Sequence, residues 1–466
     1  MIALAALLAL ASDVRLPALF GDHMVLQRES TVRIWGWAEP GERVEIRPGW
    51  SGASPVAAEA DAQGRWQVQL ATPAAGGPYE LAIAGRGKPI ELREVHVGEV
   101  WIGSGQSNME WTLGPGVGPG VEGWHEAVAA AEDPELCFFG VENTTAWAPA
   151  EDVRAQWTPA TPDAARAFSA TAYFFARKLR EELGVPIGVI TSDWGGTVAE
   201  AWTSPAGLAA FPEFAAALAS QAGHAADPAP EDPNAPALLW NGMIAPLRPY
   251  VVRGVIWYQG EANRERAEQY RTLFPALIRD WRVNFRNEAL PFYFVQLAPY
   301  GYPGDTGQAA RLRDAQRETL ALPNTGMAVT MDIGNPADIH PSQKREVGER
   351  LALWALAHDY GRTGLVFSGP LYRSMSVEKG AVRIAFEHAT GLTSRAAPVR
   401  CLTIAGADRA FHPAEGRVEG ETLIVSSPEV PAPAAVRHGW GAADQTNLWN
   451  GAGLPAPSFR TDDWPE

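Results

Sequence analysis

The chain has 466 residues, of which 46% are hydrophobic and 20% charged, and it carries a formal net charge of −16 at pH 7. A chain of this length is too long to fold around one ordinary hydrophobic core, so two or three domains are expected. Its composition is that of a globular protein and excludes a disordered chain. The acidic balance argues against a nucleic-acid partner, because phosphate binding requires basic patches.

The chain begins with an apolar stretch, MIALAALLALAS, which contains the small-x-small pattern Ala9-Leu10-Ala11. This pattern is typical of a secretion signal, although the stretch is short and has no positive n-region. Residues 1–12 are therefore predicted to be a signal peptide and the protein to be secreted or periplasmic. No other stretch approaches the roughly 18 apolar residues of a membrane span, so no membrane partner is expected.

Residues 13–95 have the pattern of a β-sandwich domain. TVRIWGWAEPGERVEIRP alternates apolar and polar residues on both sides of a Pro-Gly turn, and GRWQVQLATPAAGGPYELAIAG repeats this pattern. Short strands with regular turn signals predict a small sandwich. The domain has no cluster of titratable residues, so a structural or accessory role is expected for it.

Residues 96–368 alternate short apolar strands with helices. FSATAYFFARKLREELG and residues 342–360 have helical periodicity, with Gly184 as the predicted end of the first helix, and strand-like runs include VPIGVITSDWGG and YVVRGVIWYQGEAN. The alternation predicts an α/β domain whose mostly parallel sheet has helices on both faces. Residues 369–466 return to a β pattern and are predicted to form a C-terminal β-rich region. Whether Cys137 and Cys401 pair stays open.

Small polar residues follow four of the predicted strands. Ligands of open α/β sheets bind beyond the carboxyl ends of the strands. The four strand ends are residues 103–108, 194–197, 259–263 and 332–341. We expect them to converge on one site.

Ser107 lies on the first of these strand ends, in a glycine-rich turn suited to an exposed nucleophile. A serine hydroxyl needs a base, and His340 is the best placed of the nine histidines, in the loop after a strand and before a helix. Asp338 and Asp332 are both candidates to orient its imidazole. The alternatives are a serine that only forms a turn and a histidine that only begins a helix.

Backbone N–H groups are expected to stabilise the oxyanion. The natural donors are Ser107 and a glycine of the WGGT turn, which we assign as Gly196. A side-chain amide is the third candidate, and the spacing does not decide between Gln259 and Asn263.

Three further polar residues of these strand ends, Gln106, Asn108 and Glu261, are assigned to substrate binding. Glu261 also suits a glycosidase acid, but no second carboxylate has a compelling position relative to it. Glu261 is therefore expected to lie beneath the site and to form hydrogen bonds there.

Five blocks of the sequence carry a family resemblance: GEVWIGSGQSNMEW, SDWGGTVAEAWTS, LWNGMIAPL, GVIWYQGEAN and DIHPSQKREVGERLALWAL. In this order they resemble the signature blocks of bacterial sialate O-acetylesterases, which belong to the SGNH hydrolase superfamily. The resemblance implies an SGNH-type, flavodoxin-like parallel sheet in the catalytic domain. It also implies an acyl-serine mechanism with Ser107 as nucleophile and His340 as base and acid, without a metal or cofactor.

One position departs from the pattern of the superfamily. Many SGNH enzymes carry the acid three residues before the histidine, where this chain has Ala337. We take Asp338 as the third catalytic residue, with Asp332 or a Ser-His dyad as the alternatives.

The resemblance implies an O-acetylated sugar as substrate and hydrolysis of the O-acetyl esters of sialic acids as the reaction. Relatives also resemble acetylxylan esterases, so an esterase acting on xylan or another polysaccharide is the first alternative. A non-catalytic carbohydrate-binding protein is the second. The oligomeric state stays open.

Overall fold

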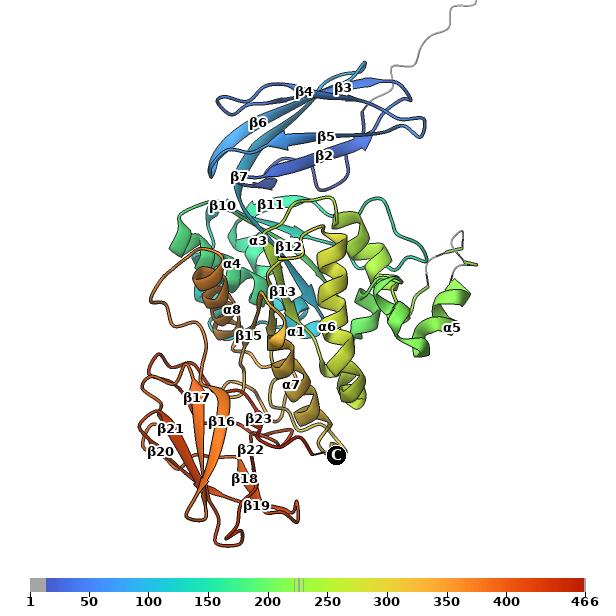
Figure 1. Ribbon diagram of the computed structural model, residues 1–466. Coiled ribbons are helices and arrows are strands. Elements are labelled where there is room, and N and C mark those ends of the chain that lie inside the picture. Colours follow the sequence, from blue (N-terminus) through green and yellow to red (C-terminus); the bar gives the residue numbers. More distant parts are fainter. Residues whose placement is uncertain (1–13, 222, 225–226, 229, 465–466) are drawn as a thin grey trace, which may run out of the picture.

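The computed structural model describes residues 14–221, 223–224, 227–228 and 230–464 (Figure 1). The predicted signal peptide, residues 1–12, lies outside the described residues. An α/β domain occupies the middle of the molecule, with N-terminal β-sheets at one end and C-terminal β-sheets at the other (Figure 1). No helix in the described part of the chain has both the length and the apolar character needed to cross a membrane.

The N-terminal part consists of six strands and the first half of a seventh. The six are β1 (Val25–Gln27), β2 (Thr31–Trp37), β3 (Arg43–Pro48), β4 (Val56–Glu59), β5 (Arg65–Ala71) and β6 (Gly76–Ala84). Strand β2 pairs antiparallel with β5, while β3 pairs antiparallel with β4 and β6. Alternate residues of β2, such as Val32 and Ile34, are buried between these sheets, as the period-two pattern predicts.

Strand β7 (Ile90–Gly105) belongs to two parts of the molecule. Its first half pairs antiparallel with β6 up to Val97, and its second half pairs in parallel with two strands of the α/β domain from Glu99 onward. The expected domain boundary at residues 95 and 96 therefore falls within one continuous strand.

The central sheet has the strand order β11-β10-β12-β7-β13-β14-β15. Its other members are β10 (Asp133–Gly140), β11 (Trp157–Ala160), β12 (Ile187–Asp193), β13 (Gly254–Tyr258), β14 (Phe292–Val295) and β15 (Thr325–Ala328). All neighbouring pairs are parallel except β10 with β11. Val255 and Trp257 of β13 join one hydrophobic core, and Ile256 and Tyr258 join another, because successive side chains point to opposite faces.

Helices cover both faces of this sheet, as predicted. Helices α4 (Ala170–Leu183) and α8 (Lys344–His358) pack together on one face, and α6 (Ala267–Asn284) and α7 (Gln308–Glu318) on the other (Figure 1). The hydroxyl of Ser169 caps the start of α4, and the helix ends at Gly184, which has φ +64° as a left-handed cap requires.

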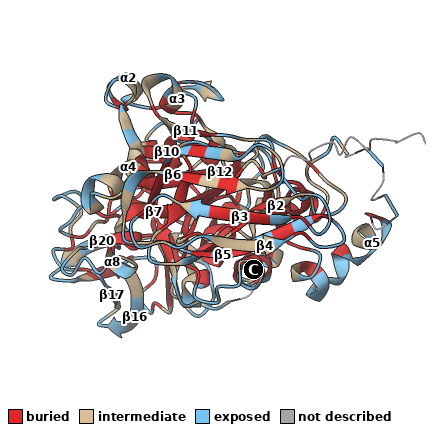
Figure 2. Cartoon of the chain, turned by 90° about the horizontal axis from the view of Figure 1, so that it is seen from above, coloured by how far each residue is buried: buried red, intermediate tan, exposed pale blue. Residues whose placement is uncertain are grey.

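Shorter elements connect these strands and helices. They are α1 (Ser107–Glu110), β8 (Pro115–Gly116), β9 (Gly118–Pro119), α2 (Trp124–Ala129), α3 (Pro162–Arg166), η1 (Ala199–Trp202), η2 (Gly207–Ala210), α5 (Pro212–Gln221), η3 (Trp240–Ile244), η4 (Ala245–Leu247), η5 (Glu261–Arg266) and η6 (Thr319–Ala321). Figure 2 shows the buried residues concentrated on the strands and the exposed ones on the outer loops.

The C-terminal region forms two four-stranded sheets around one core, which confirms its predicted β character. One sheet consists of β16 (Leu371–Glu378), β17 (Ala381–Glu387), β20 (Glu415–Glu419) and β21 (Thr422–Ser426); the other of β18 (Leu402–Ala405), β19 (Phe411–Pro413), β22 (Ala435–His438) and β23 (Phe459–Arg460). The region contacts the α/β domain near the carboxyl ends of β14 and β15, where Ser458 N–H donates to Gln296 Oε1 over 3.3 Å. Cys137 and Cys401 are free thiols.

Candidate active site

Ser107 is the first residue of helix α1 and lies two residues beyond the carboxyl end of β7. Gly105, two residues earlier, has φ +140°, and a Cβ at this position would lie 2.1 Å from the carbonyl oxygen of Tyr258. Only glycine allows β7 and β13 to approach this closely. The nucleophile candidate is therefore held at the end of a rigid, buried strand.

His340 lies in the loop between β15 and α8, and the structure brings it to Ser107. Its Nε2 is 2.9 Å from Ser107 Oγ, although 233 residues separate the two in the chain. The indole of Trp111 stacks on the imidazole, with ring centroids 4.2 Å apart and planes at 20°. Burial and the nearby ammonium of Lys344 lower the pKa of His340, against a smaller opposing effect of Asp338. The imidazole is therefore kept in the neutral form that can accept a proton.

Neither aspartate forms the expected triad bond. Asp338 Oδ1 is 3.8 Å from His340 Nδ1, beyond hydrogen-bond range, and instead accepts from the backbone N–H of His340 over 2.9 Å. Both carboxylate oxygens of Asp332 accept from Arg350 at 2.8 Å, and one also accepts from Trp449 Nε1. No carboxylate of the described residues accepts a hydrogen bond from His340 Nδ1, so the arrangement is that of a Ser-His dyad with Asp338 nearby.

Gly195, rather than Gly196, lies against the nucleophile. A Cβ at Gly195 would be 3.3 Å from Ser107 Cβ, whereas one at Gly196 would meet no atom within 4 Å. The backbone of Gly195 thus packs against the Ser107 side chain, and the role of the Gly196 N–H as an oxyanion donor stays a prediction. Sequence reasoning also missed Glu110, whose Oε2 accepts from the Gly195 N–H over 2.7 Å.

The side-chain amides of Gln259 and Asn263 are directed away from the expected oxyanion, which corrects their assignment. Gln259 Nε2 donates to Asn263 Oδ1 over 2.7 Å and to the carbonyl of Thr197 over 3.1 Å. Asn263 Nδ2 donates to Glu200 Oε2, and its Oδ1 accepts from the N–H of Ala199. Both residues are buried and brace the turn that carries the two glycines.

Gln106, Asn108 and Glu261, which the sequence predicts to bind substrate, each use at least one side-chain polar atom for a contact within the protein, while Glu261 Oε2 is buried without a hydrogen-bond partner among the described residues. Gln106 Oε1 accepts from the backbone N–H groups of Gly260 and Ala262. Asn108 is fully buried, and its Nδ2 donates to Glu261 Oε1 over 2.5 Å and to the carbonyl of Ile339. Burial raises the pKa of Glu261. These three residues lie beneath the site and fix the Ser107 turn.

Lys344 completes this buried network. It is fully buried, and its ammonium donates to Asn108 Oδ1 over 2.6 Å and to the carbonyl of Pro341 over 2.8 Å. It therefore joins the residue after Ser107 to the residue after His340. Burial lowers the pKa of Lys344 to about 7, against the opposing charges of Glu261 and Asp338.

The sequence also holds a signal for Lys344. The helix dipole disfavours a positive charge in the first turn of a helix, so a lysine at this position indicates a role other than stabilising the helix. Over the described ranges, no group of three or more His, Cys, Asp or Glu side chains is arranged to hold a metal ion.

Comparisons with known proteins place these residues within a matched family region. The family model described as carbohydrate esterase, sialic acid-specific acetylesterase matches residues 97–357, which include both Ser107 and His340. The sialate O-acetylesterases of Homo sapiens and Pongo abelii are each 32% identical to the chain over 412 residues, or 80% of this chain and 76% of the relative.

A solved structure extends the likeness to nearly the whole chain. The crystal structure of a carbohydrate acetylesterase from Xanthomonas citri matches with a TM-score of 0.88 and 42% identity, covering 97% of this chain and 100% of that one. The chain is an esterase and belongs to the sialic acid-specific acetylesterase family of carbohydrate esterases.

Proposed function

We propose that the enzyme hydrolyses O-acetyl esters of sialic acids through an acetyl-serine intermediate on Ser107. The observation that carries this proposal is the 2.9 Å contact between Ser107 Oγ and His340 Nε2 in a chain of this family. A serine hydroxyl within hydrogen-bond reach of a neutral imidazole has the geometry of an activated nucleophile.

In the first step, Ser107 Oγ attacks the acetyl carbonyl carbon while His340 Nε2 takes the hydroxyl proton. The negative charge that develops on the carbonyl oxygen is stabilised by the Ser107 N–H and by the N–H of Gly196 in the WGGT turn. The tetrahedral intermediate then collapses. The C–O bond to the sugar breaks, and His340 gives its proton to the departing sugar oxygen.

In the second step, water attacks the acetyl-serine and His340 accepts the water proton. Collapse of the second tetrahedral intermediate breaks the bond to Ser107 Oγ, which regains a proton from His340, and acetate leaves. Trp111 holds the imidazole plane by stacking, a task that a hydrogen-bonded carboxylate performs in a triad.

We also assign the catalytic domain to the SGNH type with a flavodoxin-like sheet. In chain order the strands β7, β12, β13, β14 and β15 have the spatial order 2-1-3-4-5, with β10 added beyond β12. Ligands of this fold bind where the strand order reverses, which is between β7 and β13. The Ser107 and Gln259 loops follow these two strands. Residues 1–12 support secretion or periplasmic localisation as a proposal from the sequence alone.

The test compares acetate release from O-acetylated sialic acid and from acetylated xylo-oligosaccharide. We expect release from the first, and a fall in kcat of at least about 10³-fold in Ser107→Ala because the unit loses its nucleophile. Ser51→Ala, an exposed serine of the N-terminal domain, is the matched control and is expected to retain full activity. Release from the xylo-oligosaccharide alone would change the substrate, and release from neither would favour a binding protein.

A further inference from the structure

One face of the N-terminal domain displays tryptophan, arginine and glutamine side chains in register. Arg33, Trp35 and Trp37 alternate along β2 with the buried residues, so all three point to the same side of the sheet. Strand β5 places Gln69, Gln67 and Arg65 directly opposite them. Aromatic rings beside amide and guanidinium groups are a composition suited to sugar rings and their hydroxyls.

This face looks onto the α/β domain across two adjoining cavities. The first, of about 560 Å³, lies between Trp35, Trp37 and Arg65 on one side and Pro149, Glu151, Arg248 and Pro249 on the other. The second, of about 300 Å³, lies between Arg33 and residues 285–287, and it shares Arg248 and Pro249 with the first. Together they have the size of a groove for a few sugar units.

Three arginines meet in the smaller cavity without a carboxylate to neutralise them. Arg33, Arg248 and Arg286 all line it, and none of them forms a salt bridge within the described residues. Burial and the facing charge of Arg286 lower the pKa values of Arg33 and Arg248. Asp280 also acts on Arg248, but its carboxylate is held by Ser204 and Asn284.

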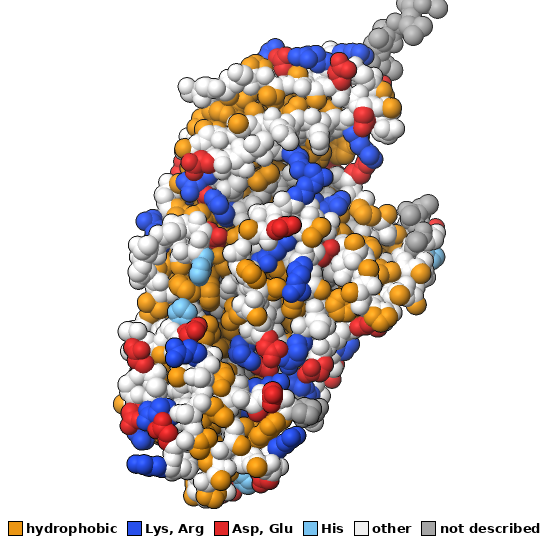
Figure 3. All heavy atoms as spheres, viewed as in Figure 1, with side chains coloured by type: hydrophobic (Ala, Val, Ile, Leu, Met, Phe, Trp, Pro, Cys, Tyr) orange, Lys and Arg blue, Asp and Glu red, His pale blue; other side chains and the backbone are white. Residues whose placement is uncertain are grey.

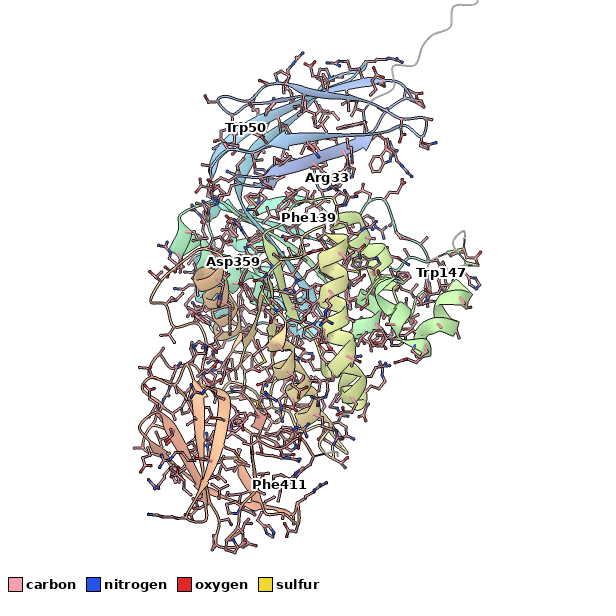
Figure 4. The ribbon with its side chains drawn as sticks, viewed as in Figure 1. Arg33, Trp50, Phe139, Trp147, Asp359 and Phe411 are labelled. Carbon is pink, nitrogen blue, oxygen red and sulfur yellow. The ribbon has the colours of Figure 1, made fainter. Side chains whose placement is uncertain are left out.

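The positive charge of this cavity contrasts with the acidic net charge of the chain. The chain carries a net charge of −16, yet Lys and Arg side chains gather at the boundary between the N-terminal sheets and the α/β domain (Figure 3), where Figure 4 labels Arg33. Arg248 Nε donates to the carbonyl of Ala245 and its Nη1 to Asn284 Oδ1, but no carboxylate of the described residues pairs with any of the three guanidinium groups. Guanidinium groups without a carboxylate partner are suited to bind a carboxylate or sulfate in a bidentate manner.

The larger cavity has a different character. Its acidic residues are Asp61 and Glu151, and Glu151 is paired with Arg65. The rings of Trp35 and Phe20 form an edge-to-face contact, with centroids 4.6 Å apart. The guanidinium of Arg15 lies 5.0 Å from the centroid of the Trp37 ring. Fixed indole rings of this kind provide stacking surfaces for pyranose rings.

From this arrangement we propose that the groove between β2 and the α/β domain is a second carbohydrate site, which binds an acidic oligosaccharide. Its sugar rings stack on Trp35 and Trp37, and its anionic group binds Arg33, Arg248 and Arg286. The groove lies far from the esterase site, because β7 runs about 23 Å from Gly98 to Gly105 at about 3.3 Å per residue. It would hold an acidic glycan chain on the enzyme without taking part in ester hydrolysis.

Isothermal titration calorimetry with two unacetylated acidic probes, trigalacturonate and sialyllactose, tests this proposal. We expect at least one of them to bind wild-type protein, more weakly as salt rises, while neutral xylotriose binds at least tenfold less tightly. Arg33→Ala and Arg286→Gly are expected to lower the affinity at least tenfold. Arg286 has φ +54°, a left-handed conformation that glycine adopts freely, so Arg286→Gly removes the charge without straining the backbone.

Arg373→Ala, an exposed arginine of β16 in the C-terminal region, is the matched control and should bind as wild type does. Hydrolysis of p-nitrophenyl acetate should be equal in all of these variants, so a failure of the esterase proposal would not affect this test. Absence of binding by both acidic probes, equal binding of xylotriose, or full affinity in Arg286→Gly would each overturn the proposal. Binding of inorganic sulfate as tight as that of the oligosaccharides would overturn its carbohydrate part.

Discussion

Replacing Lys344 by methionine is expected to leave the protein folded while impairing catalysis. The ammonium of Lys344 is fully buried and connects Asn108 to Pro341, the neighbours of Ser107 and His340. Methionine has a similar length and no charge, so it fills the same space without making either hydrogen bond.

The opposing contributions to stability nearly cancel. Burial lowers the pKa of Lys344 from its ordinary 10.5 to about 7, so the buried amine costs about 4–5 kcal/mol at neutral pH, which the substitution recovers. Against this, Asn108 Oδ1 and the Pro341 carbonyl lose their donor at about 1–3 kcal/mol each. The free energy of unfolding is therefore expected to change by less than about 3 kcal/mol.

Catalysis depends on the same contacts in a different way. Without the shared donor, the Ser107 turn and the His340 loop lose their fixed relative position, and a misplacement of about 1 Å costs about 10²-fold in rate. The positive charge of Lys344 also lowers the pKa of His340. Its removal raises that pKa, so the acid limb of the profile of kcat/KM against pH moves to higher pH, since catalysis needs neutral His340.

The assay is kcat/KM for p-nitrophenyl acetate from about pH 5 to 8, together with urea unfolding of the same samples. Lys178→Met is the matched control, because Lys178 pairs with Glu182 on the surface of α4. An unchanged rate, or an acid limb that stays in place or moves to lower pH in Lys344→Met, would refute the positioning role of Lys344.

Three further predictions concern the buried charges of Lys344 and Arg350 and the carboxylate of Asp338. The unfolded state binds more protons than the native state between the native pKa of Lys344, about 7, and its ordinary 10.5, so stability should rise with pH there; a urea series that showed the same rise in Lys344→Met would contradict this. Asp338→Asn should lower kcat less than about tenfold, since a triad carboxylate contributes about 10⁴-fold; a loss near 10⁴ would restore Asp338 as the third catalytic residue. Asp332→Ala leaves Arg350 largely buried without its carboxylate and should cost about 3–5 kcal/mol of stability in urea titrations, an expectation that an unchanged unfolding midpoint would disprove.

The α/β architecture could be predicted because local patterns report it directly. Buried runs such as residues 254–258 have both faces covered, and the amphipathic α4 ends at Gly184 where left-handed backbone is needed. The continuity of β7 could not be read from the sequence. Its transition from the N-terminal sheets to the α/β domain is a change of hydrogen-bonding partners around Gly98, and a single glycine does not distinguish a continuous strand from a turn.

The site was predictable where a residue's role depends on its own loop. The proximity of Ser107 and His340 could be predicted because each lies in a segment at the carboxyl end of a parallel strand. The roles of Gln259 and Asn263 depend instead on which atoms face them across the fold, and sequence spacing cannot supply that orientation. The same holds for Asp338, whose carboxylate turns to its own loop's backbone at a position where a shift of one residue decides the direction.

Strand β7 has a consequence for how the molecule unfolds and how its parts can be separated. Because hydrogen bonds to both sheets are made by one uninterrupted backbone, no hinge exists between the N-terminal sheets and the sheet that carries Ser107. The two should melt together as one cooperative unit, and excision of the N-terminal sheets would leave an unpaired strand end that invites aggregation. An evolutionary exchange of this module would require cutting through a strand rather than through a linker.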